Sequence, residues 1–309
     1  MTETTHVPKI GRRTFLKRLL LSSAVAAAGG LAYSFIEPHF AHVRRIPVII
    51  RGLPAALNGL TIAHLTDLHR SRVVSPEYLS ECIATANALA PDLMVFTGDY
   101  LTDFRHFARN RFDRVAEESW HFLFKETTPP GELVLECAQC MKQARAKYGV
   151  FASLGNHDNW YNGDAVAKAI ESVGIPVLRN ASRTIRINGE PLAIVGLGDL
   201  WTEGVDVARA FQNVETPFSL VLMHNPDSFE DWPREGSHLI LAGHTHGGQV
   251  VIPFYGPPHV PSRYGRKYAH GLFARGDTHM YVNRGIGLID PPVRFNCPPE
   301  IALLRLQNA

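Results

Sequence analysis

The strongest constraint on the fold of this 309-residue chain is a repeated pattern, in which a short apolar run ends in a carboxylate, a carboxamide or an imidazole. Five runs have this form: LTIAHLTD (60–67), DLMVFTGD (92–99), YGVFASLG (148–155) before Asn-His-Asp, FSLVLM (218–223) before His, and HLILAG (238–243) before His-Thr-His. Such runs predict buried strands. Ligands bind at the carboxyl edge of open α/β sheets, so we expect the polar residues to converge there.

The order of the remaining segments predicts an α/β (α+β) fold. Helices are expected at 75–90 and 163–174, and one or two amphipathic helices at 104–147, interrupted at 127–131. The later part of the chain predicts a β pair turned at Asn188-Gly189, further strands at 249–253, 279–285 and 300–306, and a loop at 253–271 rich in Pro and Gly. A βαβα order followed by mostly β structure predicts two packed sheets covered by helices.

The polar residues expected at the strand ends have the chemistry of metal ligands. They are Asp67, His69, Asp99, Asn156, His224, His244 and His246. Burying such groups is costly unless they are paired or coordinated. Mixed oxygen and nitrogen donors suit manganese, iron or zinc, and seven ligands exceed one tetrahedral site. The sequence therefore predicts two divalent metal ions sharing a carboxylate. Taken singly, Asp67 or Asp99 also fits a helix cap, and His224 fits a hydrogen-bonded core histidine.

Glycine precedes three of the expected ligand segments, at Gly98, Gly155 and Gly243. A residue without Cβ lets the backbone turn sharply and approach the ions closely.

Read in order, these segments resemble the motif set of the calcineurin-like metallophosphoesterases over about residues 58–306. The matching motifs are Asp67-Leu68-His69, Gly98-Asp99, Gly155-Asn156-His157-Asp158, His224 and Gly243-His244-Thr245-His246. The resemblance implies a four-layer α/β/β/α sandwich of two mixed sheets flanked by helices. It also implies a set of ligands for each metal: Asp67, His69 and His246 for the first, Asn156, His224 and His244 for the second, with Asp99 bridging.

The same resemblance implies the reaction. His157 is expected to be the catalytic histidine near the leaving-group oxygen, oriented by Asp158, in a single-step hydrolysis by metal-bound water. Pro292-Val293-Arg294-Phe295 and His224-Asn225-Pro226-Asp227 resemble the bacterial envelope branch, described as phosphodiesterases. The expected substrate is a small-molecule or lipid phosphodiester or pyrophosphate. The alternatives are a phosphomonoesterase or protein phosphatase, a pyrophosphate hydrolase of a nucleotide-lipid, and a non-catalytic metal-holding envelope protein.

Charge and composition indicate which partners the protein contacts. The formal net charge is only +2, from 31 basic and 29 acidic residues, so no nucleic-acid partner is expected. Asn225, Arg294 and Tyr161 are candidates for substrate contact. Residues 104–124 carry Phe, Trp and Arg, which fits either packing on the sheet or contact with a membrane surface.

The N-terminus predicts export. Arg12, Arg13, Lys17 and Arg18 precede an apolar run from Leu19 to Ile36, which resembles a twin-arginine signal read by the twin-arginine export machinery. Ala32-Tyr33-Ser34 fits a cleavage site, and the alternative is a retained membrane anchor. We therefore divide the chain into a signal or anchor with linker (1–43) and a metallophosphoesterase domain (44–309). The domain is expected in the periplasm or at the outer face of the cytoplasmic membrane.

A second segment has the spacing of a metal or redox site, Cys137-Ala138-Gln139-Cys140. No second Cys pair accompanies it, and the surrounding sequence reads as helix. We predict that these cysteines, like Cys82 and Cys297, are structural.

Overall fold

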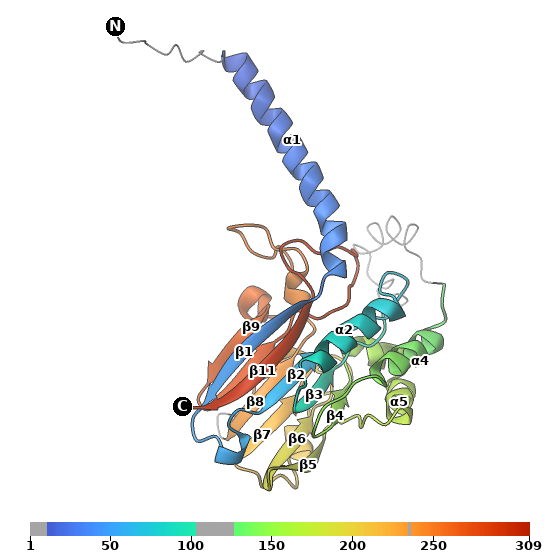
Figure 1. Cartoon of the computed structure of the whole chain (residues 1–309), viewed down its shortest axis with the longest axis vertical. Helices are drawn as coiled ribbons and strands as arrows, with labels where there is room; N and C mark the ends of the chain where they lie inside the picture. The colour runs from blue at the N-terminus through green and yellow to red at the C-terminus, as the bar shows by residue number, and fades with distance from the viewer. Residues whose placement is uncertain (1–10, 103–126, 234–235) are drawn as a thin grey trace.

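The computed structural model describes residues 11–102, 127–233 and 236–309. Helix α1 (Arg12–Ile36) extends away from a body built on two mixed sheets, as Figure 1 shows. The first sheet has five strands in the order β1 (His42–Ile50), β11 (Glu300–Asn308), β2 (Thr61–Leu65), β3 (Leu93–Thr97), β4 (Val150–Ser153). The second has six in the order β5 (Ala181–Ile187), β6 (Glu190–Gly196), β7 (Phe218–Leu222), β8 (Ser237–Ala242), β10 (Thr278–Val282), β9 (Gly271–Arg275).

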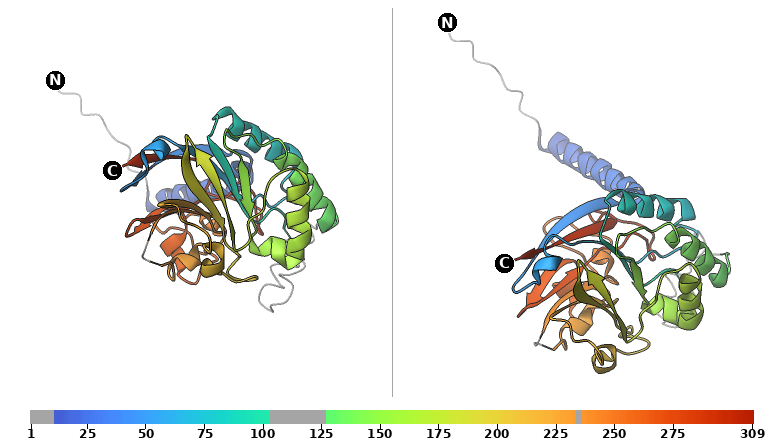
Figure 2. Two further views of the ribbon diagram at one scale, coloured as in Figure 1. Left: turned by 90° about the horizontal axis from the view of Figure 1, so that it is seen from below. Right: turned by 60° about the horizontal axis from the view of Figure 1, so that its bottom comes forward.

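Three apolar clusters define the four layers. One lies between the first sheet and the helices α2 (Pro76–Ala88), α4 (Pro130–Met141) and α5 (Asn156–Ser172). The second lies between the sheets and contains Ile62 and Val95 from one, and Leu220 and Leu239 from the other. The third lies between the outer face of the second sheet and short elements, among them α6 (Val207–Ala210), η4 (Pro226–Phe229) and η6 (Gly265–Tyr268). Figure 2 shows α2, α4 and α5, in teal and green, together on one side of the body. The structure confirms the predicted α/β/β/α layering.

Local sequence signals explain where several elements begin and turn. The Ser75 side chain accepts a hydrogen bond from Tyr78 N, and Pro76 occupies the first helical position of α2. Asn188 and Gly189 have φ of 50° and 89°, which is the geometry of a tight hairpin turn between β5 and β6. The predicted hairpin is confirmed.

Other predictions need correction. Residues 249–253 form no strand, and only isolated bridges join Val250 to Phe295 and Ile252 to Gly256. Helix α5 begins at Asn156, seven residues before the predicted start at 163, and is interrupted at Asn162 (φ −175°, ψ 94°). Strands β1 and β9 were not predicted. The expected helical segment before 127 lies outside the described residues, while α4 forms within the second half of the predicted range.

The directions of the strands in the first sheet show where α1 joins the body. β2, β3 and β4 are parallel, so their carboxyl ends lie at one edge of the first sheet. β11 is antiparallel to β2 and parallel to β1. β1 therefore begins at the edge where β2 ends, and α1, which precedes β1 through η1 (Glu37–His39), joins the body at that edge.

Candidate metal centre

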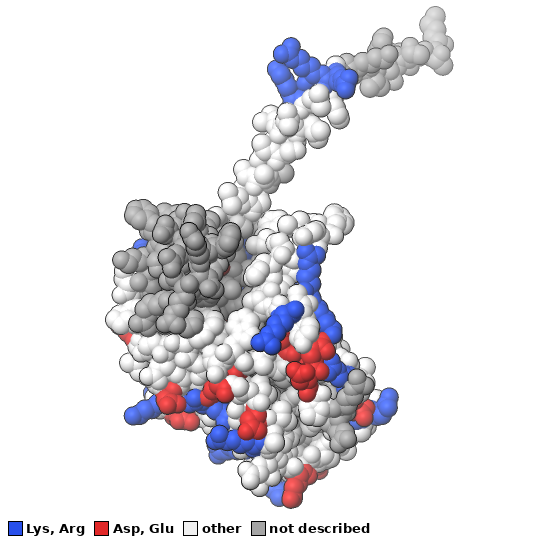
Figure 3. All heavy atoms as spheres, turned by 180° about the vertical axis from the view of Figure 1, so that it is seen from behind, with Lys and Arg blue, Asp and Glu red and all other residues white. Residues whose placement is uncertain are grey.

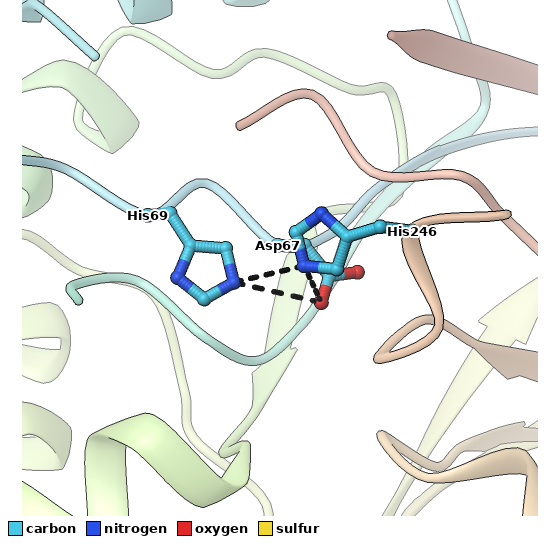
Figure 4. Close-up of side chains that lie close together, drawn as sticks. All are labelled: Asp67, His69 and His246. Carbon is cyan, nitrogen blue, oxygen red and sulfur yellow. Dashed lines mark hydrogen bonds and ion pairs between the residues drawn. The ribbon is translucent and has the colours of Figure 1, made fainter. Parts of the chain in front are cut away.

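The first predicted ligand set comes together from two loops, because Asp67 and His69 both follow β2 and His246 follows β8. Figure 4 shows the side chains of Asp67, His69 and His246 turned toward one another. His69 Nε2 lies 3.0 Å from His246 Nε2, and Asp67 Oδ1 lies 3.3 Å from His246 Nε2 and 3.9 Å from His69 Nε2. Donors held about 2.1 Å from one ion lie roughly 3–3.5 Å apart, so this spacing suits a shared cation.

The second set meets the first at Asp99. Asp99 Oδ2 lies 3.1 Å from His224 Nε2 and 3.6 Å from His69 Nε2, and Asp99, His224 and His244 place ligand atoms within 4.8 Å of one another. Asp99 thus faces both histidine groups, as a bridging carboxylate would. Asn156 Oδ1 and His244 Nε2 are buried and have no hydrogen-bond partner among the described residues. Buried polar atoms normally have hydrogen-bond partners, so these two unpaired atoms fit a role as ligands of a cation.

The backbone at these positions is strained. Five predicted ligands have φ in the left-handed region: Asp67 (52°), His69 (47°), Asp99 (56°), His244 (71°) and His246 (51°). Such conformations cost on the order of 1 kcal/mol each for residues with a Cβ and cluster at functional sites.

The neighbouring glycines allow this close packing. A Cβ on Gly155 would lie 2.2 Å from Asp99 Oδ1, and one on Gly243 would lie 2.3 Å from Asp67 Oδ2. Gly98 has φ of 95°, and its Cβ would lie 2.4 Å from Gly155 N. All three glycines therefore lie too close to neighbouring atoms to carry a side chain, while their predicted approach to the ions stays a prediction.

Hydrogen bonds select which histidine nitrogen faces the centre. His224 Nδ1 lies 2.6 Å from Thr97 O, and His69 Nδ1 lies 3.0 Å from Thr102 Oγ1. Both rings therefore turn Nε2 inward, because the other nitrogen is held by the protein.

Burial and neighbouring carboxylates set the protonation of the histidines in the centre. Burial lowers the pKa of His69, and lowers the pKa of His244 to about 3, so both imidazoles are neutral, the form that binds metal. Burial also opposes charge on His224, but the Asp99 carboxylate beside it raises the pKa of His224 to about 10. Without an ion, that proton is what compensates Asp99, and a bound cation would take its place.

Of the two residues expected to act in catalysis, His157 lies beside the metal centre and Asp158 lies beneath the loop. The His157 ring lies edge-on to His69, with centroids 4.8 Å apart, and His157 N donates to Asp99 Oδ1 at 2.9 Å. Asp158 lies beneath the loop, where its carboxylate accepts from the backbone N–H groups of Gly155, Asp99 and Tyr100, each at 2.8 Å. These contacts make Asp158 a positioning residue for the loops that carry Asp99 and His157.

An aromatic wall beside the centre was not predicted. Trp201 lies edge-on to His244 at 4.3 Å, Trp160 packs against His157 at 4.8 Å, and the two indoles stack at 6.3 Å. Trp201 is 39% exposed. The proximity of Trp160 to the Asn-His-Asp motif was the available signal, whereas Trp201 lies far from every motif in the sequence.

The three candidates for substrate contact, Arg294, Asn225 and Tyr161, pack into the protein. Arg294 is fully buried and donates to the carbonyl oxygens of Arg284, Gly285, Gly287 and Cys297, with one terminal nitrogen 3.5 Å from His246 Nδ1. It therefore supports the loop under a ligand instead of facing a substrate. Asn225 is buried and caps η4 by accepting from Asp227 N, and Tyr161 packs on the core beneath α5.

The fold and the two facing ligand sets define a class of proteins, the dinuclear metallophosphoesterases. The profile of the calcineurin-like phosphoesterase family matches residues 60–248. The chain belongs to this family, whose members depend on a dinuclear metal centre.

Three relatives extend the similarity beyond that segment. The metallophosphoesterase YkuE of Bacillus subtilis is 32% identical over 97% of this chain and 99% of its own length. Phosphodiesterase YaeI of Escherichia coli is 33% identical over 96% of this chain and 99% of its own length. The UDP-2,3-diacylglucosamine pyrophosphatase LpxG of Chlamydia trachomatis is 26% identical over 87% of this chain and 90% of its own length. The chain is accordingly a metal-dependent phosphoester hydrolase.

Proposed function

We propose that this protein is a phosphodiesterase that uses two divalent metal ions, manganese, iron or zinc, at the cell envelope. The observation that carries the proposal is the meeting of two ligand sets at Asp99, with Asn156 Oδ1 and His244 Nε2 left without other partners among the described residues. When bound, the two ions would lower the pKa of a water molecule and bind the phosphoryl oxygens.

Each residue of the site would have one of three roles: metal ligand, proton donor or positioning residue. Asp67, His69 and His246 would hold the first ion; Asn156, His224 and His244 would hold the second; Asp99 would bridge them. His157 would donate a proton or a hydrogen bond to the leaving-group oxygen, because its ring packs against His69 beside the centre. Asp158 would keep the Asp99 and His157 loops in register through its three backbone hydrogen bonds.

Two relatives support a diester or pyrophosphate over a monoester. YaeI is named a phosphodiesterase, and LpxG is named a pyrophosphatase of a diacylated nucleotide sugar. Both substrate types place a group on each side of the phosphorus. Trp160 and Trp201 would supply an apolar wall for one of these groups, since their stacked indoles flank His157 and His244.

We further propose that α1 remains as an anchor after export through the twin-arginine machinery, with the body on the outer face of the cytoplasmic membrane. Arg12–His39 is a helical stretch, among the described residues, with the length and hydropathy of a membrane span. The 25 residues of α1 are about 37 Å long, against roughly 30 Å for a bilayer core. Figure 3 shows its basic residues gathered at the end far from the body, which favours an outward-facing body.

The junction between α1 and the body supports retention over cleavage. Arg294 N donates to Ser34 O at 3.0 Å, and the Tyr33 ring lies 6.1 Å from that of Phe295. Ser34 and Glu37 are buried. Cleavage at Ala32-Tyr33-Ser34 would remove or loosen contacts that are part of the fold.

The test compares bis-p-nitrophenyl phosphate with p-nitrophenyl phosphate as substrates of the full chain in detergent, after chelation and return of manganese. Metal-dependent release from the diester, far faster than from the monoester, is expected. Release from the monoester alone would assign a phosphatase. Two bound metals per chain with neither substrate cleaved, and with no effect of His157→Gln on any phosphoester tried, would favour the non-catalytic alternative. Exposed Asp231→Asn is a matched control for carboxylate variants.

A further inference from the structure

The metal centre and the proposed anchor share one edge of the molecule. The centre lies at the carboxyl ends of β2, β3, β7 and β8, and α1 joins the body at the edge where β2 ends. A bilayer that holds α1 would therefore lie on the side of the metal centre, and surface features near α1 are candidates for contact with lipid.

One such feature is an apolar loop tip at Ile252-Pro253-Phe254-Tyr255, here called the apolar tip. Ile252 and Gly256 form a short bridge that closes the tip, with Gly256 N donating to Ile252 O at 2.8 Å. Ile252 and Tyr255 are exposed, and the Phe254 side chain is fully exposed. Phe254 also has φ of 65°, a conformation that is rare for a bulky residue. The fold thus presents a phenyl ring to the outside, in a strained backbone, without packing it.

One segment, at Phe295, contacts both the last turns of α1 and the residues that lead into the apolar tip. Val251 N donates to Phe295 O at 2.8 Å, and Val250 forms a bridge with Phe295. The Phe295 ring in turn contacts Tyr33, and it would lie 3.5 Å from a Cβ on Gly30. α1, which has the length of a membrane span, and the apolar tip are therefore joined to the body through the same segment.

The segment that contains the apolar tip carries basic residues. No acidic residue occurs from 249 to 276, and Arg263 and Arg266 are exposed, whereas Lys267 pairs with Glu230. The Arg266 guanidinium lies 4.2 Å from the centroid of the Tyr255 ring and donates to Tyr255 O. Exposed aromatic residues beside basic ones match the interface of a bilayer that contains anionic lipids.

We propose that the apolar tip inserts into the outer leaflet beside α1 and, with that helix, holds the metal centre toward the bilayer. Two contacts fix the orientation of the body where a single helix would let it swing. A phosphoester carried on a lipid headgroup would then reach the metals without leaving the membrane surface. The inference rests on the proposed retention of α1, and it does not depend on which phosphoester is cleaved.

The experiment places an environment-sensitive fluorophore on the full chain at Phe254→Cys. The four native cysteines are buried, so labelling is directed to the new thiol. The labelled chain is reconstituted through α1 into vesicles of phosphatidylethanolamine and phosphatidylglycerol, with spin-labelled lipid or aqueous iodide as the quencher. The matched control is Ile49→Cys, because Ile49 is 56% exposed near the far end of β1, away from the edge where α1 joins.

We expect lipid quenching at position 254 several-fold stronger than at position 49, and iodide quenching several-fold weaker. Equal iodide quenching at the two positions would overturn the proposal. Protection from iodide without lipid quenching would overturn it too, in favour of a protein partner such as a second copy of the chain.

A second variant excludes insertion driven by the label. Ile252→Ser with Tyr255→Ser, added to the labelled chain, should reduce lipid quenching several-fold, and unchanged quenching would show that the fluorophore alone enters the bilayer. Hydrolysis of the soluble diester by the same variants is expected to be unchanged. A failed quenching result is therefore distinguishable from a failure of the proposed hydrolase.

Discussion

Two regions of this molecule carry residues of metal-binding type at metal-binding spacing, and only one has the geometry of a metal site. The metal centre collects donors from loops after β2, β3, β4, β7 and β8. The Cys137–Cys140 pair sits on the single helix α4. Burial raises the pKa of both thiols, and Cys140 Sγ donates to Pro76 O at 3.4 Å. The predicted structural role of this pair agrees with protonated, packed thiols.

The two regions differ in whether their buried polar atoms have partners. In the metal centre, Asn156 Oδ1 and His244 Nε2 have no partner among the described residues, and five ligand positions hold strained backbone. In α4, the sulfur atoms behave as small apolar groups in the cluster beneath the helix. Ligand atoms that lack hydrogen-bond partners and converge from separate segments therefore identify a metal site better than the spacing of two residues within one segment. The following predictions test that conclusion.

The largest effect is expected for Asp99→Asn. Loss of the carboxylate that faces both ligand sets should remove at least one metal and lower diester hydrolysis by on the order of 10³-fold. Turnover and metal content per chain are measured together. Asp231→Asn should match the wild type, and a variant at Asp99 that keeps both metals and most of its turnover would refute the bridging role.

The next effect concerns His157→Gln. Removing a proton donor from the leaving group should lower turnover by about 10²- to 10⁴-fold while the chain keeps its metals. Metal analysis distinguishes this role from a ligand role, which the proximity of His157 to His69 and Asp99 also allows. Loss of metal in the variant would move His157 into the ligand set.

Metal removal should then lower stability in the body. A ligand present at about a thousand times its Kd stabilises the native state by about 4 kcal/mol. Thermal unfolding with and without chelator should therefore show a higher Tm for the loaded protein. The shift should shrink in Asp99→Asn, and a chelator effect equal in the two proteins would point to metal bound elsewhere.

Arg294→Gln should have a smaller and different effect. Its guanidinium satisfies buried carbonyls of the loop next to His246, so the variant should lose at least about 2 kcal/mol of unfolding free energy. Affinity for the metal should fall by about tenfold, as for other residues that support ligands, while KM for the diester changes little. Exposed Arg183→Gln is the control. A large rise in KM without loss of metal affinity would return Arg294 to the substrate contacts.

The smallest effect is expected for Cys140→Ala. Turnover and metal content should equal those of the wild type, and the free energy of unfolding should fall by about 1 kcal/mol or less, because two weak hydrogen bonds to sulfur and little volume are lost. Loss of a metal from this variant would show that α4 holds a metal and would break the comparison.

Much of the fold could be predicted because its signals are local. Apolar runs before polar ends located β2, β3, β4, β7 and β8, and Asn188-Gly189 located a hairpin. Strand β1 was missed because HVRRIPVII carries basic residues and a proline, which only an edge position tolerates. The Val250–Ile252 segment has strand-like residues but meets Phe295 and Gly256 only through single bridges.

The sequence by itself determined which residues have the chemistry of ligands and that strand ends would carry them, since apolar runs and the polar residues that follow them are properties of neighbouring residues. Tertiary structure decided that Asp99 faces both histidine groups, that Trp160 and Trp201 stack beside them, and that Arg294 turns inward. It also placed α1 at the edge of the metal centre and brought Val250, just before the apolar tip, against Phe295. These relations join residues far apart in the chain, so they follow from strand order and direction, which no local pattern encodes.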